Sequence, residues 1–177
     1  MRRIVFLLGF MSVATNAIAD TAAKGGLRVG LDFEQQIYMR QGLRLEKVSE
    51  ESGSALGVTL GSQSAASVQA DGTRNHRKVV DYGAYYLGRR SIAQDLNHRL
   101  GLQIGQMSFH NGASTSTTSG WYFDVVQGLA VSYGKVDFFT DVAIRYWALS
   151  PNKDMQVGDR KLESNYVYPR LGFNIAI

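Results

Sequence analysis

The chain has 177 residues, with 19 Lys and Arg, 15 Asp and Glu, and no cysteine. The lack of cysteine excludes a disulfide framework and a cysteine-based metal site, and the nearly balanced charge lacks the basic excess typical of nucleic-acid-binding proteins. No apolar run approaches the roughly 20 residues that a membrane-spanning helix requires, so we expect any membrane insertion to use strands.

The first 19 residues have the three parts of a secretory signal peptide. Arg2 and Arg3 precede an apolar run of about ten residues, and Ala17-Ile18-Ala19 supplies the small residues before a cleavage site. A retained N-terminal helix is the alternative, but the run is too short to span a bilayer. We therefore predict a signal peptide over residues 1–19 and a single domain over residues 20–177, whose net charge would be +2.

Alternation of apolar and polar residues with a period of two predicts β-strands with one apolar face. The last segment is typical, because Leu171, Phe173, Ile175 and Ile177 share one face while Arg170 and Asn174 lie on the other. Eight segments are candidate strands; the facing of the fourth is ambiguous because Tyr85 and Tyr86 are adjacent. In chain order they are 27–34, 43–46, 56–61, 79–87, 100–105, 121–133, 136–147 and 170–177.

The connections between these segments alternate in length. Gly134-Lys135 fits a two-residue type II′ hairpin turn, whose first position requires a positive φ. Segments 48–53 and 89–98 fall on the same inner side as this turn, whereas the polar segments 65–77, 110–119 and 150–165, which are longer on average, fall on the outer side. Short inner turns and long outer loops are typical of transmembrane barrels. The first hairpin, around residues 35–41, is hard to place.

These features predict an all-β fold, an eight-stranded antiparallel up-and-down transmembrane β-barrel. Each tilted strand needs about 9–11 residues, so about sixteen strands would use the whole mature chain and leave no loops. A soluble β-sandwich, or a lipocalin-like barrel with its apolar face turned inward, is the alternative. The many glycines on the polar face favour the membrane barrel, because small residues make room for large side chains inside a narrow barrel.

This layout resembles the small outer-membrane barrels of the OmpA transmembrane-domain and OmpX/Ail type, over the whole mature chain. The resemblance implies a monomer in the cell outer membrane of a Gram-negative bacterium, in contact with membrane lipid, lipopolysaccharide and the outer-membrane assembly machinery. Such proteins usually end in Phe or Trp, whereas this chain ends in Ile177. An apolar terminal residue on the outward face keeps the character of the assembly signal.

The polar strand face would place a set of charges inside the barrel. We expect these residues to form cross-strand ion pairs, because an unpaired charge in a narrow lumen is costly. A structural salt-bridge network is the favoured interpretation, and a narrow ion path is the alternative. The predicted set is Arg28, Asp32, Glu34, Asp124, Asp137, Asp141, Arg145 and Arg170.

Ser108 and His110 lie two residues apart and so on one strand face near the outer rim. They are candidates for a nucleophile and its base. Lipid A deacylases of the PagL type are small barrels that use Ser, His and Glu, but this chain has the reverse order of their His-x-Ser, and Arg145 and Trp147 stand where His and Ser would be needed. Catalysis is therefore the second hypothesis for function, and a passive channel is the third.

A basic cluster in the predicted 65–77 loop and the residue after it, Arg74, His76, Arg77 and Lys78, is a candidate contact for lipopolysaccharide phosphates. His76 and His98 fall in predicted connections, and three scattered histidines do not indicate a metal site. We predict no metal and no cofactor. The first hypothesis for function is a structural or surface-interaction role, in which the outer loops contact lipopolysaccharide or a partner protein.

Aromatic residues gather near the strand ends, and Trp and Tyr prefer the two membrane interfaces. Trp121, Tyr122, Tyr146 and Trp147 near the outer ends are therefore predicted to belong to an aromatic girdle.

Overall fold

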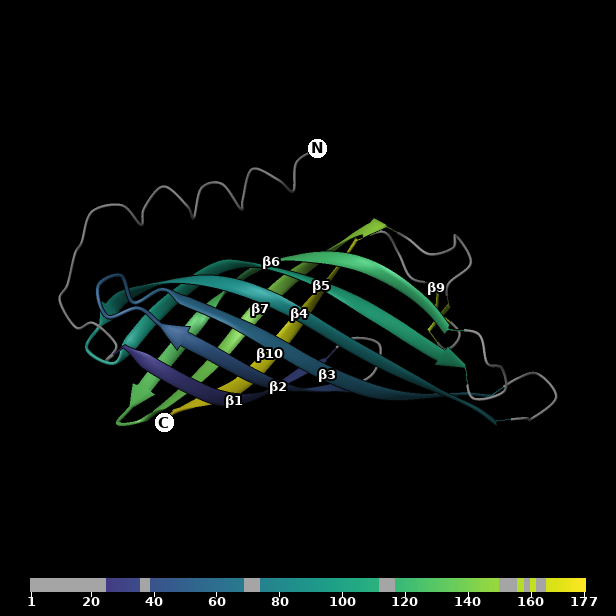
Figure 1. The fold of residues 1–177 in the computed structure, drawn as a ribbon, viewed down its shortest axis with the longest axis horizontal. Helices are drawn as coiled ribbons and strands as arrows, with labels where there is room; N and C mark the ends of the chain where they lie inside the picture. The colour runs from purple at the N-terminus through teal and green to yellow at the C-terminus, as the bar shows by residue number, and fades with distance from the viewer. Residues whose placement is uncertain are drawn as a thin grey trace.

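A computed structural model of the chain describes residues 25–35, 39–68, 74–111, 117–149, 156–157, 160–161 and 165–177. Within them, eight antiparallel strands close into a barrel in the order β1-β10-β7-β6-β5-β4-β3-β2 (Figure 1), which confirms the predicted fold class. The strands are β1 (Gly26–Gln35), β2 (Met39–Val48), β3 (Ala55–Val68), β4 (Arg74–Ala93), β5 (Leu96–Asn111), β6 (Thr117–Tyr133), β7 (Val136–Leu149) and β10 (Asn165–Ala176). A separate two-stranded sheet pairs β8 (Gln156–Val157) with β9 (Arg160–Lys161).

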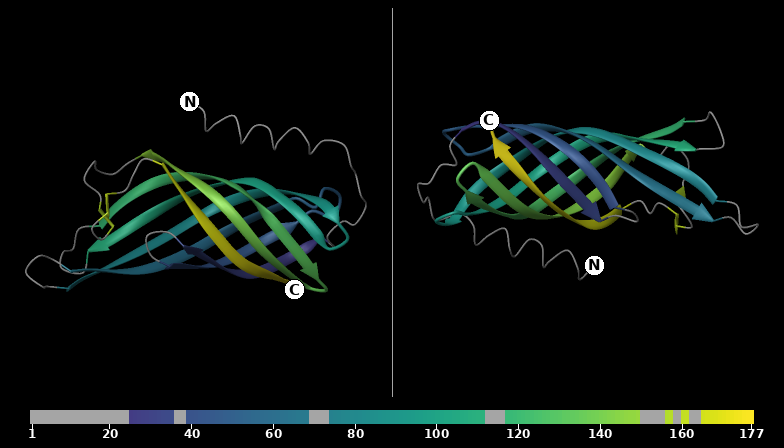
Figure 2. Two further views of the ribbon diagram at one scale, coloured as in Figure 1. Left: turned by 180° about the vertical axis from the view of Figure 1, so that it is seen from behind. Right: turned by 90° about the horizontal axis from the view of Figure 1, so that it is seen from below.

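The barrel closes between the first and last strands. β1 pairs with β10 over seven register positions, from Arg28 opposite Ala176 to Glu34 opposite Arg170. All other neighbours in the barrel follow one another along the chain, with the small β8–β9 sheet inserted between β7 and β10 (Figure 2). Closure leaves no open sheet edge, so every barrel strand has a hydrogen-bonding neighbour on both sides.

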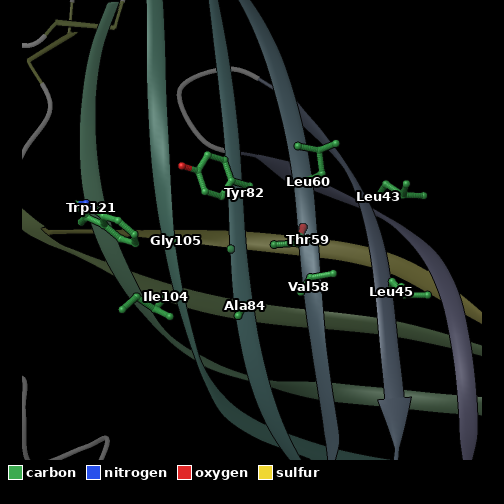
Figure 3. A pocket seen from close by; sticks show the side chains of 11 residues that line it. Leu43, Leu45, Val58, Thr59, Leu60, Tyr82, Ala84, Ile104, Gly105 and Trp121 are labelled. Atoms are coloured by element: carbon green, nitrogen blue, oxygen red, sulfur yellow. The ribbon is translucent and has the colours of Figure 1, made fainter.

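The apolar face of every barrel strand points outward. Leu56, Leu102 and Val167 are 64%, 55% and 64% exposed, and they alternate with buried residues along their strands. Figure 3 shows part of this wall, where Leu43, Leu60, Ile104 and Trp121 line a shallow hollow of about 590 Å³. The soluble alternatives are wrong, because they require this face to form a dry core.

The predicted turn at Gly134-Lys135 is present between β6 and β7. Gly134 has a φ of +59°, whereas Lys135 is not among the residues with positive φ, as a type II′ turn requires. Because the period of a strand is two, this turn fixes the register of both strands and therefore which residues face inward. Tyr133 opposite Val136 is the first pair above it.

Several predicted boundaries were wrong because the strands are longer than the alternating pattern. Segment 89–98 was assigned to an inner connection, but β4 continues to Ala93 and β5 begins at Leu96. Segments 65–77 and 110–119 were assigned to outer loops, yet eight residues of the first belong to β3 and β4 and half of the second belongs to β5 and β6. Backbone hydrogen bonding between strands does not require an apolar face, so pairing continues past the residues that alternate.

The facing of the fourth strand is also settled. Asp81, Tyr85 and Leu87 are buried, whereas Tyr82 and Tyr86 are exposed. Tyr122 was assigned to an aromatic girdle, and this was wrong, since its side chain is fully buried inside the barrel while its neighbour Trp121 faces outward.

The predicted signal peptide, residues 1–19, lies outside the described residues. Among the residues that the structure describes, none forms a helix long and apolar enough to cross a membrane.

Candidate functional site

The lumen of the barrel is filled by charged side chains. Its described part holds seven arginines and seven carboxylates, and no lysine, so the formal charges cancel. All fourteen side chains are nearly inaccessible to solvent: Arg28, Arg40, Arg44, Arg89, Arg99, Arg145 and Arg170, with Asp32, Glu34, Glu46, Asp81, Asp124, Asp137 and Asp141. Arginine suits this environment because its planar guanidinium can bind two carboxylates and stack on a ring at the same time.

Glycines on the inward face make room for these large side chains. A Cβ atom added at Gly61 would collide with the guanidinium of Arg40, and one added at Gly105 would collide with the Tyr122 hydroxyl. A narrow barrel cannot hold a large side chain at every inward position, so small and large residues alternate around it. The glycine-rich polar face of the sequence is thus a packing requirement of the lumen.

The inner cluster, toward the short turns, joins four strands. The two terminal nitrogens of Arg89 on β4 donate to Asp137 on β7 at 2.5 Å and to Glu46 on β2 at 2.7 Å. Arg28 on β1 also forms an ion pair with Asp137. The Tyr85 hydroxyl donates to Glu46 at 2.9 Å. Each carboxylate therefore has a positive partner from across the lumen.

Aromatic rings support the arginines of the middle layer. The Arg44 guanidinium lies 4.2 Å from the ring centre of Tyr85 and 4.9 Å from that of Phe139, so it is held between the two. Arg99 lies 4.1 Å from the same Phe139 ring and 3.5 Å from Asp141. Cation–π contacts strengthen when both partners are removed from water, which is the case here.

Two arginines organise the outer cluster. Arg40 donates to both carboxylate oxygens of Asp81, at 2.5 and 2.6 Å, and to Asp32 at 2.8 Å. Arg145 donates to both oxygens of Asp124 at 2.8 Å. Bidentate arginine–carboxylate pairs are among the strongest hydrogen-bonded contacts in proteins. They connect β2 to β4 across the lumen, and β6 to its neighbour β7.

All eight charges that the sequence predicted to be interior lie inside the barrel. Arg145 pairs with Asp124, Arg28 with Asp137, and Arg170 with Asp141 at 3.2 Å. Six further members of the network were absent from the predicted set: Arg40, Arg44, Glu46, Asp81, Arg89 and Arg99. Arg44 and Glu46 shared the polar face of a predicted strand, so strict use of alternation would have found them. Asp81 lay in a segment whose facing was ambiguous, and Arg40 lay in the first hairpin, which was hard to place. Arg89 lay in a segment assigned to a connection, and Arg99 lay outside every assigned segment.

The arginines and carboxylates of the lumen form ion pairs with one another. No group of three His, Cys, Asp or Glu in the described ranges could hold a metal ion. Every arginine of the network lies within 4 Å of a carboxylate. These ion pairs link the strands of the barrel to one another.

Ser108 and His110 lie on β5 near its outer end. Ser108 is half-buried and pairs in register with Val80 and Ser119, while His110 pairs with Lys78 and Thr117. None of these four register partners is a carboxylate, so the adjacent strands do not supply the acid of a nucleophile–base–acid set at these positions. The side chain of His110 lies outside the described residues.

The basic cluster was predicted in an outer loop, and this was wrong in its local structure, because Arg74, His76, Arg77 and Lys78 all belong to β4. β3 pairs with β2 only as far as Ser62 and continues to pair with β4 to Val68. Lys78 is exposed, and the other three side chains lie outside the described residues. His98, predicted in a connection, lies on β5 opposite Arg90.

No family model and no curated protein matches the chain. Among solved structures, Neisserial surface protein A (NspA) has a TM-score of 0.58 at 11% identity, covering 85% of this chain and 94% of its own. Ail of Yersinia pestis, in complex with the heparin analogue sucrose octasulfate, has a TM-score of 0.45 at 10% identity, covering 86% and 98%. NspA is a small outer-membrane barrel, so the predicted resemblance is confirmed at the level of the fold.

Proposed function

We propose that this protein is a monomeric outer-membrane barrel that serves as a closed, rigid scaffold and presents its outer hairpins for surface interaction. Support for membrane insertion comes from the outward apolar face, since a soluble protein rarely exposes so large a contiguous apolar surface. Leu31, Leu43, Leu60 and Phe138 are each at least 40% exposed and belong to four different strands.

The observation that carries the proposal is the excess length of the strands toward the outer end. β1 and β2 have 10 residues each, which matches a span of about 9–11 residues. β4 has 20 residues, β5 has 16 and β6 has 17. In Figure 1 the β3–β4 and β5–β6 hairpins reach well past the ends of β1 and β2. A paired hairpin presents a defined surface, unlike a disordered loop.

The filled lumen favours presentation over transport. A conducting path would need mobile water and ions, whereas here the arginines and carboxylates neutralise one another across the lumen. Opposite charges held at 2.5–3.2 Å leave no room between them for a hydrated ion. The same ties keep the barrel from deforming, so that the hairpins above it stay in place.

For the partner we propose the phosphate groups of lipopolysaccharide, contacted by Arg74, His76, Arg77 and Lys78. These residues begin β4 on the part of the hairpin that extends above the last β2–β3 pair. Clustered cations bind phosphate through charge-assisted hydrogen bonds. Binding should therefore weaken with salt.

The test is binding of purified lipopolysaccharide to the protein refolded in detergent micelles. Arg74→Gln, Arg77→Gln and Lys78→Gln, combined in one variant, should weaken binding by about tenfold or more, since each charged contact is worth roughly 1 kcal/mol. Lys47→Gln at the inner end of β2 is the matched control and should bind as the wild type does. Equal binding by both variants, or steady conductance of the wild type in a planar bilayer, would overturn the proposal.

A further inference from the structure

The outward wall carries one polar site that neither the scaffold nor the outer hairpins explain. Arg90 on β4 and His98 on β5 are register partners and both face outward, away from the lumen. On the next strand, the amide nitrogen of Gln127 lies 3.4 Å from Nε2 of His98. Among the described residues of the barrel strands, the other charged side chains that face outward are Lys47 and Lys78, which lie near the two ends of the wall.

These three residues line a hollow rather than a flat surface. Its volume is about 560 Å³, and its apolar walls include Tyr86, Leu100 and Leu102. Gly88 forms part of the lining. The hollow therefore combines hydrogen-bond donors and a fixed positive charge with an adjoining apolar channel.

The position of the hollow along the barrel axis corresponds to the membrane interface on the inner side. The hydroxyl of Tyr86 donates to the Ser54 hydroxyl in the β2–β3 turn at 3.0 Å. Arg90 lies four residues beyond Tyr86 toward the β4–β5 turn, on the same strand face. Arg90 and His98 are thus level with the short turns, whereas Leu100 and Leu102 point to the hydrocarbon side.

We propose that this hollow binds the phosphodiester of a glycerophospholipid from the inner leaflet, with one acyl chain along Leu100 and Leu102. Arg90 supplies the charge that complements the phosphate, and His98 and Gln127 supply further donors. The apolar wall gives the acyl chain the same environment as the bilayer interior. The polar end of the hollow therefore determines which lipid binds. The inference rests on insertion of the barrel in a membrane and is independent of binding at the outer end.

The experiment is native mass spectrometry of the protein refolded in mixed micelles of detergent and phosphatidylglycerol. The wild type should retain one lipid, and Arg90→Gln should lower the retained fraction about tenfold, the effect of losing one charge-assisted contact. Gly88→Val tests the shape without changing charge. A Cβ at Gly88 meets only the Leu100 carbonyl oxygen, at 3.5 Å, so the variant should fold while its side chain narrows the hollow. Lys47→Gln is the control and should retain lipid as the wild type does.

A heat-dependent shift in gel mobility shows that each variant has inserted as a closed barrel, which separates loss of the lipid from loss of membrane insertion. Retention by Arg90→Gln or Gly88→Val equal to that of the wild type would overturn the proposal, as would absence of lipid from the wild type. Inorganic phosphate should not displace the lipid. If it does, the hollow is a simple anion site and the assignment to a phospholipid is wrong.

Discussion

Neutralising Asp124 should destabilise the barrel by about 3–5 kcal/mol, the usual cost of breaking a buried ion pair by removing one partner. Asp124 is fully buried and receives three hydrogen bonds, two from Arg145 at 2.8 Å and one from the Tyr168 hydroxyl at 2.7 Å. Asp124→Asn keeps the size of the side chain but removes the charge that balances Arg145. The Arg145 guanidinium also lies 3.7 Å from the ring centre of Tyr122, so it cannot turn toward water.

A double-mutant cycle tests this reasoning. Arg145→Met alone should cost a similar amount, because it leaves the Asp124 carboxylate buried without its main partner. The double variant should lose about 2 kcal/mol less unfolding free energy than the two single variants lose together, since neither charge then remains. Urea unfolding in detergent micelles, followed by tryptophan fluorescence and gel mobility, measures all three. Additive effects, or a cost below about 1 kcal/mol for Asp124→Asn, would refute a tightly coupled pair.

Substitutions at four further positions test other parts of the fold by urea unfolding, in micelles for the three glycine positions and in lipid vesicles for Val142. Gly61→Leu should cost at least about 1–3 kcal/mol by overpacking against Arg40, whereas Gly88→Ala should be nearly neutral because its site has space. Gly134→Val should cost about 1–2 kcal/mol, since φ is +59° there, and Gly134→Asn should cost less. Val142→Arg on the outward wall should cost about 2–4 kcal/mol in a bilayer, and a cost near zero would show that this position does not face lipid.

The residues that share one face of a strand could be predicted from the sequence wherever apolar and polar residues alternated without interruption. Asp137, Asp141 and Arg145 repeat every four residues on β7, and all three side chains point into the lumen. The Gly134-Lys135 turn supplied the register of β6 and β7. On β4 the inward face could not be predicted, because two adjacent tyrosines interrupt the alternation. Asp81 was therefore absent from the predicted set.

The omitted residues share a physical cause. Arg89 and Arg99 lie where β4 and β5 continue past the alternating pattern. Arg89 belonged to a segment that was assigned to a connection, and Arg99 lay between that segment and the next predicted strand. Arg40 lies in the first hairpin, whose boundaries could not be read. Near its ends, a barrel strand no longer needs an apolar outward face. The alternating pattern of apolar residues therefore ends before the hydrogen-bonded strand does.

The sequence by itself determined the all-β class, the number of barrel strands and which residues of a strand share its apolar face, because these depend on a local period of two. Only the tertiary structure decided which charges pair. Arg40 binds Asp81 at a separation of 41 residues, and Arg89 binds Asp137 at a separation of 48. These contacts cross the lumen between strands that are not hydrogen-bonded neighbours, so they depend on closure of the barrel and on its register, which no local pattern encodes.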